Sequence, residues 1–231
     1  ATLVVFQFAV SIGLIICTAV IYGQTVFARH VDPGYKRDHI LQVEELGRAQ
    51  LISRQEAIVG QMSRLPGVVA ASLADLGVNT TNQSNTYIIP LGSNQQILIG
   101  QYNVGQDYMH AMGLPLKAGR WFDQSRPADD MTTPYPPDPS VEKTIAQRGV
   151  NVVINEYAAH KLGFASAQDA VGKTVRGKLL SDDAGIMNIN IIGVVGDTRF
   201  RTVRTPIEPL MFHTVRTGPG WMIIRYRGDP A

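Results

Sequence analysis

The side chains best suited to acid–base or metal chemistry are the five histidines, which are scattered along the chain. They are His30, His39, His110, His160 and His213. A zinc site on a helix needs ligands one turn apart, as in H-E-x-x-H, and no second histidine has that spacing. His160, beside Lys161, is expected on a short helix as a solvated or half-buried residue. We therefore predict no metal-binding residues.

Motifs for nucleophilic catalysis and nucleotide binding are also missing from the sequence. Ser72 and Ser181 lie outside the G-x-S-x-G pattern that presents a hydrolase nucleophile. Gly193-Val194-Val195-Gly196 lacks the spacing of a dinucleotide fingerprint, and no G-x-x-x-x-G-K-[ST] loop occurs. The sequence predicts no catalytic residues, no cofactor-binding residues and no enzymatic activity.

Two pairs of adjacent aspartates, Asp129-Asp130 and Asp182-Asp183, are candidate cation ligands. Hard cations require six or more oxygen ligands, and neighbouring side chains on an extended segment point in opposite directions. Solvated loops are therefore favoured for both pairs. Trp121 and Phe122 are candidates for an exposed contact with a partner. The favoured alternative is that Gly119-Arg120 forms a turn and both rings pack into the domain.

The composition excludes several classes of protein. The 231 residues include 21 Lys and Arg and 19 Asp and Glu, a formal net charge of +2. The basic residues are scattered, unlike those of a nucleic-acid-binding surface, so we expect no nucleic-acid partner. Cys17 is the single cysteine, which excludes a disulfide scaffold and a thiolate metal site within this sequence.

The stretch from Leu3 to Phe27 contains no charged residue. A helix of this length exceeds the roughly 30 Å hydrocarbon core of a bilayer, which about 20 apolar residues cross. We predict a transmembrane helix over residues 1–28. A buried soluble helix would show a polar face, and a signal peptide would have a basic leader and a shorter apolar core. A lipidated Cys17 would follow a small residue, whereas Ile16 precedes it.

Beyond this helix, the apolar patterns predict a mixed α+β domain. Predicted strands cover residues 39–45, 68–73, 86–90, 95–104, 150–154, 173–179, 188–195, 210–215 and 221–226. Predicted helices cover residues 53–65, 108–113 and 156–162. Residues 123–149 are rich in proline and have little apolar periodicity, which indicates an insertion or a flexible loop.

Local signals mark several of these boundaries. Ser53-Arg54-Gln55-Glu56 matches a capping box at the start of the first soluble helix, and Asn155 is a favourable N-cap. Residues 77–85 are rich in turn formers and are predicted to be an exposed loop. The sequons at Asn79 and Asn82 lie in this loop, and we do not expect them to be glycosylated.

A series of short motifs follows in order along nearly the whole chain. They are QFAVS at 7–11, LPGV at 65–68, MGLPLKAGRWF at 112–122, VINE at 153–156, VGK at 171–173, IGVVGD at 192–197, and RTP at 204–206 with Pro209 and Phe212. Each motif is weak alone. The ordered set resembles the MacB/FtsX-type ABC transporter permeases.

The resemblance implies that the transmembrane helix precedes a periplasmic domain with a porter-like βαβ half and an inserted small α/β lobe, called Sabre. Residues 39–103 and 205–231 would form the porter-like part, and residues 104–204 the Sabre-like lobe. Members of the family continue past the position of residues 227–231 into a helix, a strand and a returning transmembrane helix. We therefore expect a fragment whose porter-like part is incomplete.

The resemblance also implies a non-catalytic permease of the bacterial inner membrane, with its large domain in the periplasm or outside the cell. A cytoplasmic ATPase subunit or domain would drive it by mechanotransmission, in which the helix transmits motion as a rigid lever. Residues 1–31 contain no proline that would kink this helix. The other implied partners are membrane lipid, a second permease in a homo- or heterodimer, and a periplasmic adaptor. The cargo would be a peptide, lipid, lipoprotein or antibiotic.

Two other classes of function stay open from the sequence. A membrane-anchored ligand-sensing or interaction module would share the anchor and the domain, but it would not co-purify with an ATPase. A membrane-anchored enzyme is disfavoured because no catalytic constellation is present, and a hydrolase screen would test it.

Overall fold

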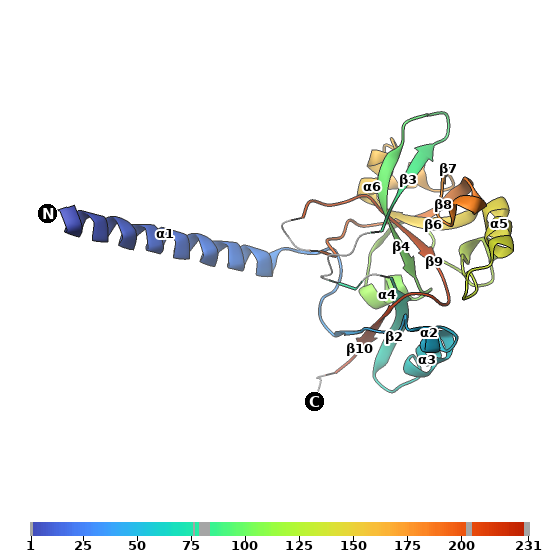
Figure 1. Cartoon of the computed structure of the whole chain (residues 1–231), viewed down its shortest axis with the longest axis horizontal. Coiled ribbons are helices and arrows are strands. Elements are labelled where there is room, and N and C mark those ends of the chain that lie inside the picture. The colour runs from blue at the N-terminus through green and yellow to red at the C-terminus, as the bar shows by residue number, and fades with distance from the viewer. Residues whose placement is uncertain (1, 76, 79–83, 202–204, 229–231) are drawn as a thin grey trace. The chain divides into compact units, whose positions relative to one another are not determined.

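The computed structural model describes residues 2–75, 77–78, 84–201 and 205–228 (Figure 1). The chain divides into two compact units, Ala1–Pro33 and Gly34–Ala231. Several predicted features lie outside the described residues, namely both sequon asparagines Asn79 and Asn82, Arg204 of the RTP motif, and residues 229–231.

The first unit contains the helix α1 (Thr2–His30), in which no described side chain is buried. The hydroxyls of Thr18 and Thr25 each donate a hydrogen bond of 2.8 Å to a carbonyl four residues earlier, so the helix satisfies them internally. At about 1.5 Å per residue, the helix exceeds the roughly 30 Å hydrocarbon core. Among the described residues, α1 is the one helix long and apolar enough to cross a membrane. The predicted uninterrupted apolar helix is confirmed.

The second unit contains a three-stranded antiparallel sheet. Its strands are β1 (Ile40–Val43), β10 (Trp221–Tyr226) and β2 (Val68–Ala74), with β10 in the middle. Helix α3 (Gln55–Met62) packs on one face of this sheet. The buried residues of this small core are Leu46, Ala71, Leu73, Met222 and Ile224. The predicted order of strand, helix and strand is confirmed.

The predicted capping box at Ser53 is wrong. Ser53 ends a separate short helix, α2 (Ala49–Ile52), and α3 has no side-chain cap at its N-terminus. The buried Gln55 holds the start of α3 instead, because its side-chain amide donates to the carbonyls of Leu46 and Pro219 at 2.9 and 2.8 Å. Hydrogen bonds to distant loops replace the local cap that the sequence pattern indicates.

A further six strands close into a ring through backbone pairing. They are β3 (Asn85–Pro90), β4 (Ile97–Val104), β6 (Val150–Asn155), β7 (Thr174–Gly177), β8 (Met187–Val195) and β9 (Leu210–Thr214). The order is β4-β3-β7-β8-β6-β9. Strand β9 in turn pairs with β4 in parallel, which closes the ring. The pair Ala74↔Val104 joins β2 of the three-stranded sheet to β4. Strand β5 (Leu116–Gly119) pairs with β8.

Two predicted helices are confirmed with their boundary signals. Helix α4 (Tyr108–Met112) ends at Gly113, whose φ of +64° lies in the left-handed region that glycine favours. Helix α6 (Glu156–Lys161) starts at Asn155, whose side chain accepts a hydrogen bond of 3.0 Å from the amide of Ala158.

The prediction of a loop over residues 123–149 is wrong in part. Helix α5 (Pro139–Arg148) lies within it. The Asp138 side chain caps this helix by accepting a hydrogen bond of 2.8 Å from the amide of Ser140, and Pro139 occupies the first turn, where its missing N–H costs no helical hydrogen bond. The remaining short helices are η1 (Pro127–Asp129), α7 (Ala167–Ala170) and η2 (Asp182–Ala184).

Two larger cores lie on opposite faces of the ring strands, as alternating side chains require. In β9, Met211 belongs to the first core and Phe212 to the second. Helices α5, α6 and α7 contribute to the first core, and α4 contributes to the second. The predicted α+β class is confirmed.

Candidate functional site

The predicted candidate residues do not assemble into a catalytic or metal site in the described part of the chain. No group of three or more His, Cys, Asp or Glu residues there could hold a metal ion. His160 is exposed, as predicted, while the rings of His39 and His110 contact Tyr226 and Trp121. His30 lies at the end of α1.

His213 is buried in β9, and both of its ring nitrogens lack a hydrogen-bond partner within the described residues. Burial lowers the pKa of His213 to about 4, because the charged imidazolium would lose its hydration. The ring is therefore neutral near pH 7.

Neither of the two serines considered as nucleophiles has a histidine partner among the described hydrogen bonds. The hydroxyl of Ser72 is buried in β2 and has no hydrogen-bond partner among the described residues. The Ser181 hydroxyl donates to the carboxylate of Glu142 in α5. Among the hydrogen bonds of the described residues, none joins either serine to a histidine, and nucleophilic catalysis of the serine–histidine type requires such a bond.

The prediction that Asp129 lies in a solvated loop is wrong. Its side chain is 1% exposed, and its two oxygens accept hydrogen bonds of 2.6 and 2.9 Å from the Arg120 guanidinium. The Asn151 amide donates to the same carboxylate. Burial by itself would raise the pKa of Asp129, but these hydrogen bonds outweigh it and hold the pKa below the usual range. Asp129 is a structural ion-pair partner.

The other aspartates considered as cation ligands differ in exposure. Asp130 is half-buried and binds Arg216 at 2.8 Å. Asp182 and Asp183 are exposed, as predicted, and Asp182 accepts from Lys178 at 3.0 Å. These contacts are ion pairs within the protein rather than a cation-binding cluster.

The aromatic pair after β5 packs inward, in agreement with the favoured interpretation. Phe122 is buried in the second core, and Trp121 is half-buried against it. Gly119 has a φ of +81°, and an added Cβ would lie 2.2 Å from the Ile192 carbonyl oxygen. Only glycine makes this turn without a clash, and the turn directs the two rings toward the core.

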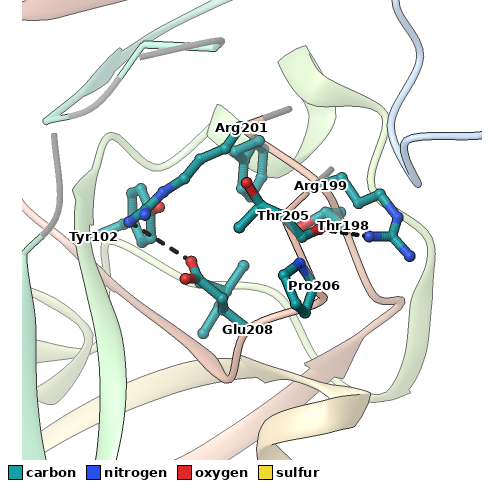
Figure 2. A pocket seen from close by; sticks show the side chains of 9 residues that line it. Tyr102, Thr198, Arg199, Arg201, Thr205, Pro206 and Glu208 are labelled. Atoms are coloured by element: carbon teal, nitrogen blue, oxygen red, sulfur yellow. Dashed lines mark hydrogen bonds and ion pairs between the residues drawn. The ribbon is translucent and has the colours of Figure 1, made fainter. Parts of the chain in front are cut away.

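A pocket that the sequence did not indicate lies beside β4 and the segment that follows β8 (Figure 2). Its empty volume is about 260 Å³. Arg201 and Glu208 point toward one another across it, with a nitrogen–oxygen distance of 3.6 Å. Arg199 points away and donates a hydrogen bond of 2.7 Å to the carbonyl of Thr205. The buried Thr198 hydroxyl has no described partner.

The apolar side of this pocket is a cluster of aromatic rings. Tyr102 and Phe200 line the pocket, with their ring centroids 5.8 Å apart, and both rings contact Phe212 of β9. Burial raises the pKa of Tyr102 and that of Tyr108, so both phenols are neutral near pH 7. The pocket offers aromatic surface, one guanidinium and one carboxylate, which suits binding rather than catalysis.

The fold of the chain is similar to that of the periplasmic region of MacB. The periplasmic region of MacB from Actinobacillus actinomycetemcomitans matches with a TM-score of 0.51 at 14% identity, over 86% of this chain and 78% of that chain. The extracellular domain of the ABC-type transporter YknZ from Gram-positive bacteria matches with a TM-score of 0.46 at 12% identity, over 82% of this chain and 84% of that chain. A domain assigned to a permease protein of Porphyromonas gingivalis matches with a TM-score of 0.47 at 16% identity, over 83% of this chain and 75% of that chain.

No protein-family model and no curated protein matches the sequence. The MacB match shows that the domain has a fold of the MacB periplasmic type, and this domain follows the apolar helix α1, as the sequence resemblance predicts.

Proposed function

We propose that the chain is part of a non-catalytic ABC transporter permease. In this proposal α1 crosses the inner membrane, and the second unit lies in the periplasm or outside the cell. The observation that carries the proposal is the combination of an uninterrupted apolar α1 with a domain of the MacB periplasmic fold. The cargo is a peptide, lipid, lipoprotein or antibiotic that the permease exports or extracts.

We infer that a cytoplasmic ATPase subunit or domain supplies the energy, and that α1 carries its motion by mechanotransmission. The lack of proline in α1 supports this role, because the helix has no built-in kink. The other proposed partners are membrane lipid, a second permease in a homo- or heterodimer, and a periplasmic adaptor. We propose a non-catalytic role because the fold that the domain shares is that of a transporter's periplasmic region.

We infer a porter-like part over 39–103 and 205–231, and a Sabre-like lobe over 104–204. The pairing of β10 with both β1 and β2 supports grouping the last segment with the first. Strand pairs β3–β7 and β6–β9 cross the proposed boundary, so the two parts share one hydrogen-bonded sheet system.

The second candidate is a membrane-anchored module that senses or binds a ligand without a pump. The pocket between Arg201, Glu208 and Tyr102 favours it, because such a pocket could hold a small polar ligand. The two candidates differ in their partners rather than in their fold.

Affinity purification from membranes tests the permease proposal. A tagged full chain is crosslinked in its native membrane, purified in detergent and analysed by mass spectrometry. We expect to recover a protein with an ATP-binding P-loop, and to measure ATP hydrolysis in the eluate. A tagged single-span protein of unrelated fold is the control. Recovery of the chain without any such ATPase contradicts the proposal and favours the sensing module.

A further inference from the structure

A cleft lies between helix α3 and the loops that follow β4 and β9. It consists of two adjoining hollows, with empty volumes of about 420 and 260 Å³. Four residues line both hollows, namely Gln106, Gln124, Val215 and Arg216. We refer to this feature as the α3 cleft. It is separate from the pocket of Figure 2, with which it shares no lining residue.

Apolar side chains form much of the surface of the α3 cleft. Val59 of α3, Leu73 of β2 and Val215 after β9 all line it, and Leu73 and Val215 are largely withdrawn from water. Phe122 lines the adjoining hollow. An aliphatic group bound here would remove apolar surface from water, which favours binding.

The rim of the α3 cleft carries excess negative charge. The acidic lining residues are Glu56, Asp107, Asp123, Asp129 and Asp130, whereas Arg216 is the one cationic residue among the lining residues of the two hollows. Two of these carboxylates have partners outside the lining, Asp123 with Arg126 at 3.4 Å and Asp129 with Arg120 at 2.6 Å. Arg216 is already engaged by Asp130 at 2.8 Å and by Glu56 at 4.0 Å. The exposed Asp107 carboxylate has no hydrogen bond or ion pair within the described residues, and it does not cap α4.

Amide groups at the rim provide hydrogen-bonding capacity. The side chains of Gln106 and Gln124 line both hollows, and neither forms a hydrogen bond within the described part of the chain. A primary amide both donates and accepts, as a peptide backbone does. Each glutamine can therefore pair with a peptide group of a ligand.

We propose that the α3 cleft binds a cationic, amphipathic peptide segment. An aliphatic side chain of the ligand lies against Val59, Leu73 and Val215, a Lys or Arg side chain lies beside Asp107, and the ligand backbone bonds to the two glutamines. The proposal rests on the proposed transport function, for which it names the class of cargo. Charge complementarity selects cationic over anionic peptides.

Calorimetric titration of the full chain in phosphatidylcholine nanodiscs tests the proposal, since this lipid has no net charge to attract the probes. The probes are acetyl-Leu-Lys-Leu-amide and acetyl-Leu-Glu-Leu-amide, which differ in the sign of one charge. We expect saturable binding of the lysine peptide and about tenfold weaker binding of the glutamate peptide. Higher salt should weaken binding of the lysine peptide more than binding of the glutamate peptide. Equal binding of the two peptides, or no binding of either, overturns the proposal.

Three variants locate the site. Asp107→Asn removes one charge without changing the side-chain shape, and should weaken binding of the lysine peptide about threefold. Val59→Phe places a larger side chain in the hollow and should weaken binding of the lysine peptide at least about tenfold. Ala57→Phe, at an exposed position of the same helix, is the matched control and should bind normally. Thermal unfolding checks that Val59→Phe folds, and Asp107→Asn decides the question if it does not.

Wild-type affinity in both Asp107→Asn and Val59→Phe overturns the assignment to the α3 cleft. Co-purification of the ATPase is measured independently of peptide binding. If the peptide-binding results overturn the cleft proposal but the ATPase is recovered, the permease proposal stands. Peptide binding without an ATPase shows that the cleft binds peptides, but it contradicts the permease proposal and with it the role of the peptide as cargo.

Discussion

At the scale of single residues, His213 makes the folding of the second unit sensitive to pH. Its pKa is about 4 in the folded chain and about 6.5 in an unfolded one. Between these values the unfolded chain takes up a proton that the folded chain does not, so stability falls as the pH drops below about 6.5. The full effect is about 3 kcal/mol, reached below about pH 4.

We expect the free energy of unfolding to fall by about 2 kcal/mol between pH 7 and pH 5 through this residue. Urea titration of the full chain in detergent measures it, with tryptophan fluorescence as the probe, because both tryptophans lie in the second unit. The His213→Leu variant should lack this fall in unfolding free energy between pH 7 and pH 5. The His160→Gln variant, changed at an exposed histidine, should still show it. An unchanged pH dependence in His213→Leu would argue that other groups are responsible.

The Arg120–Asp129 pair is a second feature of single residues with a measurable effect. Asp129→Asn removes the charge from a buried carboxylate that accepts hydrogen bonds from Arg120, Asn151 and the amide of Asp123, and should cost about 2 kcal/mol of unfolding free energy. The matched control is Asp182→Asn, whose side chain is 93% exposed beside Lys178 and which should change stability by less than about 0.5 kcal/mol. Equal effects of the two substitutions would be evidence against a stabilising role for Asp129.

The sequence could not identify these residues because their roles depend on distant partners. Asp129 looks like a surface aspartate until Asn151 and Arg120 are brought to it from β6 and the end of β5. In the pocket of Figure 2, Tyr102 comes from β4, while Arg201 and Glu208 follow β8. No spacing rule links Tyr102, Arg201 and Glu208, so the sequence does not predict any of these three as a site residue.

At the scale of elements, the predicted strands agree closely with the structure because their apolar residues alternate or run continuously. Helix α5 was missed because prolines and aspartates precede it and only Ile145 and Glu142 are buried in it. The same residues are in fact its start signal, since Asp138 caps the helix and Pro139 follows at once.

Removal of this cap should weaken α5. Asp138→Ala leaves the amide of Ser140 without its acceptor, and should cost about 1 kcal/mol of unfolding free energy. Urea unfolding measures the loss, and Asp183→Ala, in an exposed turn without a cap bond, serves as the control. A loss no larger than that of the control would show that the cap is dispensable.

The lever role of α1 is also a prediction about an element. Ala19→Pro interrupts the helix near its middle, at a cost of about 3 kcal/mol or more, and introduces a kink. We expect ATP hydrolysis and transport to become uncoupled in a reconstituted complex, while urea unfolding of the second unit is unchanged. Ala19→Leu at the same position keeps the helix straight and should behave as wild type. Normal transport by Ala19→Pro would refute the lever.

At the scale of the whole molecule, the two units differ sharply in the surface that they present. The first is an apolar helix without buried side chains, and the second contains three apolar cores. The sequence indicated both units and the α+β class. The ring of six strands could not be predicted, because the parallel pairing of β4 with β9 joins residues 110 positions apart.

Deletion of residues 1–33 should separate these properties. We expect residues 34–231 to be monomeric in buffer without detergent, and the full chain to require detergent or lipid. Size-exclusion chromatography with light scattering measures both masses, and tryptophan fluorescence confirms that the shortened chain is folded. A full chain that stays monomeric in plain buffer would be incompatible with a membrane-spanning α1.

Strand β4 has a mechanical consequence for the second unit. The three-stranded sheet is attached to it through the single residue pair Ala74↔Val104, with hydrogen bonds from Asp75 to Asn103 and from Gly105 to Leu73 around it. The second core extends across this joint, because Ala74 of β2 and Ile223 of β10 belong to it together with Val104 of β4. A torque on one sheet therefore reaches the other through packed side chains as well as through this short stretch of backbone, which stiffens the joint.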